Sequence, residues 1–235
     1  MFSKSIGRLT IFKKILLEKK VKSLIIHSIL NKYLKVPKKL SINSDLKKKL
    51  FFVSEPKYHP DNKFLNKQIK KTNYFKLLFF GNFFYGKGLD ILMQSAKGLS
   101  KNIKIIVAGN DLRLNYYLKL KKYRNIKIIN KYFSDSEMYE IFKSVDGIIL
   151  PYRKTYTYGT SGVLLNSAQA YKPVLVPNFY PFSDTVKKYK FGRTFVAENI
   201  NDIKKNINKF QKLVEKNFFK KKYFLNYLDD INKWD

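Results

Sequence analysis

YGTSGVLLNSAQAYKPVLVP, residues Tyr158 to Pro177, contains a complete loop–helix–strand unit. A small-residue loop, Gly159 to Gly162, leads into a short apolar helix over Val163 to Ala170, and a Lys-Pro pair then ends that helix. Val174 to Val176 has the pattern of a buried strand, as does Asp146 to Pro151 just upstream of the unit. This order predicts a βαβ crossover whose helix begins beside the strand ends. The free amides and positive dipole end of such a helix favour phosphate, although many α/β proteins have this turn without a ligand.

The same alternation of strands and helices continues along the chain from Phe75 onward. A Ser134–Glu137 capping box is expected to begin a helix that ends near Ser144. Further strands are predicted at Phe75–Phe80, Ile103–Ala108, Ile126–Ile129 and Thr194–Ala197, and further helices at Leu89–Leu99, Leu112–Lys122, Asn201–Val214 and Asn217–Ile231. We therefore predict an α/β fold, a Rossmann-like parallel sheet with helices on both faces and right-handed connections. Ligands of such sheets bind at the carboxyl ends of the strands.

The N-terminal region differs from the rest of the chain. Leu9 to Lys20 predicts a basic amphipathic helix, which either faces a core or lies on anionic lipid. Val21–His27 and Leu50–Ser54 have strand patterns, and a polar segment rich in Lys, Asn and Pro follows. We predict three regions: a short α/β remnant of an N-terminal domain (1–56), a linker (57–74) and a ligand-binding domain (75–235).

Composition limits the functions that this chain can have. Without cysteine, and with only two histidines, it offers no thiolate site and no histidine-rich metal centre. The formal charge of +31 would suit nucleic acid, but only five of the 48 basic residues are arginine, the preferred partner of guanine and phosphate. Attraction to an anionic membrane surface fits this composition better. No apolar run approaches the roughly 20 residues of a membrane span, and no signal peptide is visible, so we expect a cytoplasmic protein, peripheral at the inner membrane face.

Three loops that follow strands are expected to meet in one crevice. They are Gly81–Gly88, Asn130–Phe133 and Pro151–Gly162. Together they offer glycines for close backbone approach, the ammonium of Lys87, the guanidinium of Arg153 and a helix N-terminus, a set that suits a diphosphate. Tyr132 and Phe133 either flank a base or belong to the core.

Four motifs together resemble a known family. They are Phe79-Phe80-Gly81 through Tyr85-Gly86-Lys87-Gly88-Leu89-Asp90, Asp146 through Pro151, Ser161-Gly162-Val163-Leu164-Leu165 and Lys172-Pro173-Val174. In this order they look like the donor-binding C-terminal half of a GT-B glycosyltransferase of the retaining group 1, or family 4, type. The resemblance covers roughly Phe75 to Ala197. It implies transfer of a sugar from a nucleotide-sugar donor, such as a UDP- or GDP-sugar, to a glycan or lipid-linked acceptor, with no cofactor and no essential metal.

The resemblance also implies roles for individual residues. It identifies no catalytic residue and no metal ligand in this chain. By the resemblance, Lys87 would neutralise the donor diphosphate, and the amides of Ser161, Gly162 and Val163 would hold its phosphates. We also expect Gly81 and Asn82 to contact the diphosphate, and the nucleotide or sugar to contact Tyr132, Phe133, Arg153, Tyr158 and Asn166.

Three features depart from the family pattern. Asn82 stands where the family usually has arginine, and Tyr158 and Asn166 stand where it has a pair of glutamates. Asn166 can still hydrogen-bond ribose hydroxyls, but only as a neutral amide. Only about 55 residues precede the linker, whereas the family has a complete acceptor domain there. Either the chain is a fragment, or a separate acceptor-domain chain is its partner.

Three functions are therefore weighed. The first is a glycosyltransferase or its donor-binding half. The second is a non-catalytic or partner-dependent module that binds nucleotide sugars. The third is a basic nucleic-acid-binding protein, and it rests on charge alone.

Overall fold

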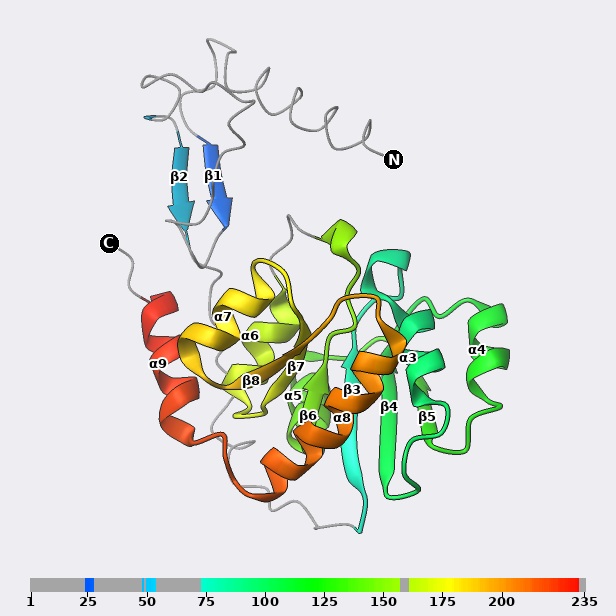
Figure 1. Cartoon of the computed structure of the whole chain (residues 1–235). Coiled ribbons are helices and arrows are strands. Elements are labelled where there is room, and N and C mark those ends of the chain that lie inside the picture. The colour runs from blue at the N-terminus through cyan, green and yellow to red at the C-terminus, as the bar shows by residue number, and fades with distance from the viewer. Residues whose placement is uncertain (1–23, 28–47, 49, 54–72, 157–160, 233–235) are drawn as a thin grey trace. The chain divides into compact units, whose positions relative to one another are not determined.

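The computed structural model of the chain describes residues 24–27, 48, 50–53, 73–156 and 161–232 (Figure 1). The predicted helix at 9–20, most of the predicted linker and Tyr158 lie outside these residues. The chain divides into two compact units, Met1–Pro56 with Ile231–Asp235, and Lys57–Asp230. In the first unit, β1 (Leu24–His27) and β2 (Leu50–Val53) form a parallel pair in which Leu24 lies opposite Leu50.

The second unit contains a parallel sheet of six strands in the order β5-β4-β3-β6-β7-β8. Its central strands are apolar runs that the helices bury on both faces, as expected of parallel sheets. The strands are β3 (Phe75–Phe80), β4 (Ile103–Gly109), β5 (Ile126–Asn130), β6 (Gly147–Ile149), β7 (Val174–Pro177) and β8 (Gly192–Phe195). The strand order reverses between β3 and β6, and this switch point is where open α/β sheets bind ligands. The predicted Rossmann-like fold class is confirmed.

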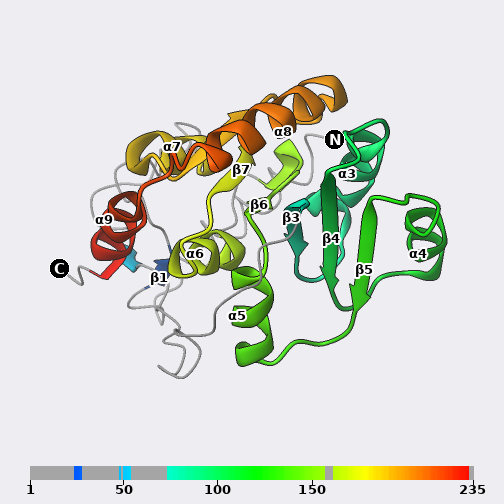
Figure 2. The same cartoon turned by 90° about the horizontal axis from the view of Figure 1, so that it is seen from below.

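Helices cover both faces of this sheet. Figure 2 shows α3 and α8 on one face and α5 and α6 on the other, while α4 lies beside the edge strand β5. The helices are α3 (Leu89–Ala96), α4 (Leu114–Leu120), α5 (Asp135–Lys143), α6 (Gly162–Gln169), α7 (Phe182–Tyr189), α8 (Ile200–Glu215) and α9 (Lys221–Asn232). None of the helices in the described residues is both long enough and apolar enough to cross a membrane.

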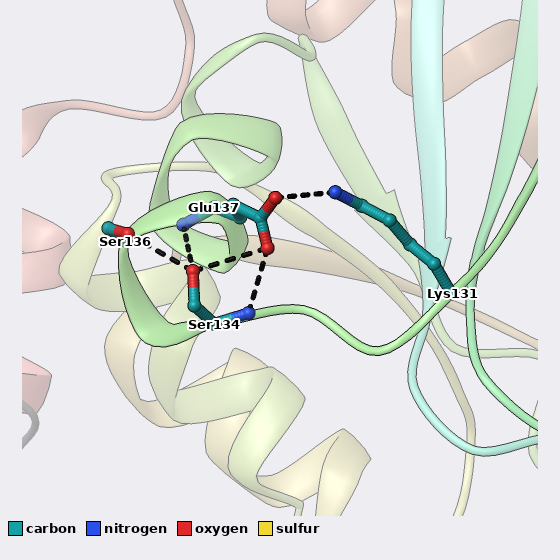
Figure 3. Close-up of polar contacts among 4 residues, drawn as sticks. All are labelled: Lys131, Ser134, Ser136 and Glu137. Carbon is teal, nitrogen blue, oxygen red and sulfur yellow. Dashed lines mark hydrogen bonds and ion pairs between the residues drawn. The ribbon is translucent and has the colours of Figure 1, made fainter.

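The predicted capping box at the start of α5 is confirmed (Figure 3). The Ser134 amide donates to the Glu137 carboxylate at 3.0 Å, and the Glu137 amide donates to Ser134 Oγ at 3.4 Å. Lys131 forms an ion pair with the same carboxylate. The hydrogen bond from Lys131 is the main reason why the pKa of Glu137 is lowered to about 2. The Glu137 carboxylate is therefore ionised at neutral pH.

Several elements differ from the sequence prediction. Helix α9, for example, begins at Lys221, four residues later than predicted. Helix α7 was not predicted, although Phe182, Val186 and Tyr189 are all buried and follow helical spacing. Strand β8 was predicted two residues too late. It ends at Phe195, because the next amide that faces β7, that of Ala197, donates to the Asn178 side chain at 3.0 Å instead of to a backbone carbonyl.

Candidate functional site

The candidate site lies at the carboxyl ends of β3 and β6, where the strand order reverses. The loop after β3 contains a short 3-10 helix, η3 (Tyr85–Lys87), and the loop after β6 contains another, η4 (Lys154–Tyr156). Gly88 ends η3 with a φ of 67°, and a Cβ at this position would lie 2.0 Å from the Pro151 carbonyl oxygen. Only glycine therefore permits both the backbone conformation and the close approach of the two loops.

Lys87 is a buried cation without an acidic partner in the described part of the chain. Lys87 is only 8% exposed, and its Nζ donates to the Phe80 carbonyl at 3.4 Å. The nearest aromatic rings, Phe84 and Tyr152, lie with centroids 5.7 and 6.0 Å from Nζ. Burial lowers the pKa of Lys87 from 10.5 to about 8. A bound anion would favour the charged form of this lysine.

The N-terminus of α6 is the second anion-attracting feature. Ser161 is buried and caps the helix, since its Oγ accepts the Leu164 amide at 3.4 Å. The Tyr152 hydroxyl lies 3.4 Å from the same Oγ and helps to fix it. Gly162 is exposed, and a Cβ built on it would have no atom within 4 Å. The first amides of a helix have no acceptor within the helix, so this end of α6 presents N–H groups beside open space.

Gly81 lies next to both the Lys87 ammonium and the first turn of α6. Its φ is +108°, and a Cβ at this position would lie 2.4 Å from Lys87 Nζ and 4.0 Å from Val163 Cγ2. The Lys87 ammonium and the first turn of α6 therefore flank the same glycine. An ammonium near the first turn of a helix favours an anion with several oxygens, such as a diphosphate.

The other predicted contacts are spread more widely. Asn82 is exposed at the surface of the β3 loop, and Tyr132 is 81% exposed. Phe133 packs edge-on against Phe80 at 5.3 Å between ring centroids, so it belongs to the aromatic cluster behind the site. Asn166, on α6, directs Nδ2 to the sulfur of a methionine on α5 at 3.2 Å. The roles of these residues toward a nucleotide stay predictions.

Arg153 makes more contacts than its predicted role requires. Its guanidinium forms ion pairs with Asp90 and with Glu198, the latter at 3.0 Å, and lies 3.9 Å from the centroid of the Tyr85 ring. The two carboxylates raise the pKa of Arg153 against the lowering effect of burial. Sequence reasoning missed Glu198 and this use of Asp90, because the partners lie 45 and 63 positions from Arg153 and no local pattern joins them.

A parallel sheet with this order defines the doubly wound class of α/β domain, whose ligands bind at the switch point. The family model of the glycosyl transferases group 1 matches residues 60–218. The chain belongs to this family, and the predicted resemblance is confirmed. A search of curated proteins found no match.

Solved structures of glycosyltransferases share the fold. A glycosyltransferase from Rickettsia africae is 15% identical with a TM-score of 0.69, over 95% of this chain and 62% of that one. A mutant of S. aureus TarM, solved in complex with fondaparinux, alpha-GlcNAc-glycerol and UDP, is 15% identical with a TM-score of 0.67, over 94% and 43%. The C-terminal domain of LpcC from Francisella tularensis, a group 1 family protein, is 14% identical with a TM-score of 0.53, over 76% and 94%. This chain thus spans 62% and 43% of the Rickettsia and S. aureus chains.

Proposed function

We propose that this chain binds the diphosphate of a nucleotide-sugar donor and acts as the donor-binding half of a glycosyl transfer. The observation that carries the proposal is the buried Lys87 ammonium, which has no carboxylate partner in the described residues and shares Gly81 with the N-terminus of α6. Burying an ammonium without a counter-charge is unfavourable, so the arrangement makes physical sense when an anion occupies it. Membership of the group 1 family supports sugar transfer over nucleic-acid binding.

The site's chemistry follows from where charge develops. In glycosyl transfer the bond between the anomeric carbon and the diphosphate oxygen breaks, and negative charge accumulates on the departing diphosphate. Lys87 and the amides of Gly162 and Val163 would stabilise that charge as fixed, preorganised donors. We propose that they do so without an essential metal ion, and that the acceptor is a glycan or a lipid-linked sugar.

The direct test is titration calorimetry with UDP and GDP. Wild-type protein should bind at least one of them, and Lys87→Ala should weaken that binding about 100-fold, because it removes a desolvated charge-assisted contact. Lys101→Ala is the matched control, since Lys101 is an exposed lysine in another loop. Absence of binding to any nucleoside diphosphate, or equal losses in the two variants, would refute the proposal.

A second candidate is a nucleotide-sugar-binding module that does not itself transfer sugar. It is favoured by Asn166, which stands in the place of a family glutamate and whose amide contacts a methionine sulfur. The two candidates differ in turnover. Hydrolysis or transfer of a radiolabelled nucleotide sugar by this chain alone would rule out the module, and tight binding without turnover would favour it.

A further inference from the structure

We propose that Arg153 is a positioning residue of the donor site: it clamps the loop that carries Lys87 against the end of β6, using Asp90 and Glu198 as its two fixed partners. This inference rests on the proposed function, because it assigns Arg153 a purpose within the same site. Arg153 itself need not contact the donor.

The first part of the clamp holds η3. The Arg153 amide donates to the Gly86 carbonyl at 2.9 Å, and Arg153 Nε donates to the Tyr85 carbonyl at 3.2 Å. The guanidinium also covers the Tyr85 ring at 3.9 Å from its centroid. Lys87 is the last residue of η3, so these contacts fix the segment from which its side chain projects.

The second part of the clamp connects three strand ends. Asp90 lies in the first turn of α3, directly after the Lys87 loop, and Glu198 follows β8. The Arg153 side chain is only 11% exposed where it pairs with both carboxylates. A planar guanidinium can bind two carboxylates in fixed directions, whereas a lysine ammonium is a mobile point charge. The loops after β3, β6 and β8 are thereby tied together at the carboxyl edge of the sheet.

Glu198 adopts a backbone conformation that carries a local cost. Its φ is +62°, in the left-handed region that favours glycine and is uncommon for a long side chain. Such backbone conformations concentrate at functional sites, where the surroundings compensate for them. A glycine at position 198 would relax the backbone, but it would leave Arg153 with Asp90 as its one carboxylate partner. The ion pair with Arg153 therefore gives a reason for glutamate at this position.

Loss of the clamp should release η3 and expose Lys87. We would measure two quantities on the full chain: UDP or GDP affinity by calorimetry, and the pKa of the Lys87 amine by competitive acetylation with peptide mass spectrometry. In Arg153→Gln the affinity should fall about tenfold, as for other lost supporting contacts. The pKa of Lys87 should rise from about 8 toward 10.5 as burial decreases.

Arg193→Gln is the matched control. Arg193 also makes a side-chain hydrogen bond, to Asn206 at 2.8 Å, but it lies at the start of β8, away from the carboxyl edge of the sheet.

Glu198→Gly is a second variant that should fold well, because glycine tolerates the positive φ. It should shift the nucleotide affinity and the pKa of Lys87 in the same direction as Arg153→Gln. Unchanged Lys87 titration in folded Arg153→Gln and Glu198→Gly would overturn the proposal. Equal effects in Arg193→Gln, or full rescue of both readouts by Arg153→Lys, would also overturn it.

The two measurements separate this inference from the proposed function. If wild-type protein binds no nucleoside diphosphate, the proposed function fails, while the titration of Lys87 still reports whether Arg153 positions it. If wild-type protein binds a nucleoside diphosphate, but neither the affinity nor the pKa of Lys87 changes in Arg153→Gln, only the positioning role of Arg153 is refuted.

Discussion

Lys87 is a residue whose burial opposes folding and, on our proposal, serves binding. At pH 7 the ammonium is charged in both the folded and unfolded chain, so the full cost of burying it is present. Between about pH 8 and 10.5 the unfolded chain binds the proton more tightly, so stability rises with pH through that window.

We therefore expect Lys87→Met to stabilise the protein while abolishing nucleotide binding. The pKa difference corresponds to about 3 kcal/mol at pH 7, and the gain should disappear above about pH 10.5. Urea denaturation at pH 7 and pH 10.5 would measure this gain. A variant that is less stable than wild type at pH 7 would show that Lys87 has a structural role.

The pH dependence of nucleotide affinity should report the same group. Phosphate oxygens stabilise the ammonium, so the affinity should be constant between about pH 7 and 8 and fall by up to about tenfold per pH unit above it. Lys87→Arg keeps its charge at all these pH values and should bind with a flat profile. Calorimetry with UDP from about pH 7, above the pKa of its terminal phosphate, to about pH 10 would check this, and a flat wild-type profile would contradict it.

At the scale of elements, the sequence predicted those with strong local signals. The apolar run of β3 was placed to the residue, and the Ser134–Glu137 box located the start of α5. Helix α7 was missed despite its spacing of buried residues, and β8 was displaced because its ladder ends where the Ala197 amide donates to the Asn178 side chain, 19 positions away. The partners of Arg153 were unpredictable for the same reason: tertiary structure, not local pattern, brings them together.

Two glycines should respond oppositely to substitution by alanine. Gly88→Ala adds a Cβ 2.0 Å from the Pro151 carbonyl oxygen in a left-handed conformation, whereas Gly162→Ala adds one beside empty space at the start of α6. Gly88→Ala should destabilise by about 2 kcal/mol or more, and Gly162→Ala should stabilise by up to about 1 kcal/mol. Thermal unfolding of both variants would measure the contrast. Equal melting temperatures would mean that the two loops are not in contact.

At the scale of the whole molecule, the formal charge of +31 predicts attraction to anionic surfaces. We expect co-sedimentation with vesicles that contain phosphatidylglycerol, and none with phosphatidylcholine alone. Because surface charge is screened, binding should be strong at low salt and largely lost near about 0.5 M salt. No sedimentation with anionic vesicles even at low salt would contradict the predicted membrane association.

The pairing of β3 with β6 also constrains how the chain is assembled. The Lys76 amide donates to the Asp146 carboxylate at 2.7 Å across 70 positions of sequence, whereas β3 pairs with β4 and β4 pairs with β5, the next strands along the chain. During synthesis the half-sheet of β3, β4 and β5 can therefore form early, from short-range contacts, while the ligand crevice must wait for β6 and α6 to leave the ribosome. A translational pause before residue 147 would leave a nascent domain with a partial sheet and an incomplete candidate site.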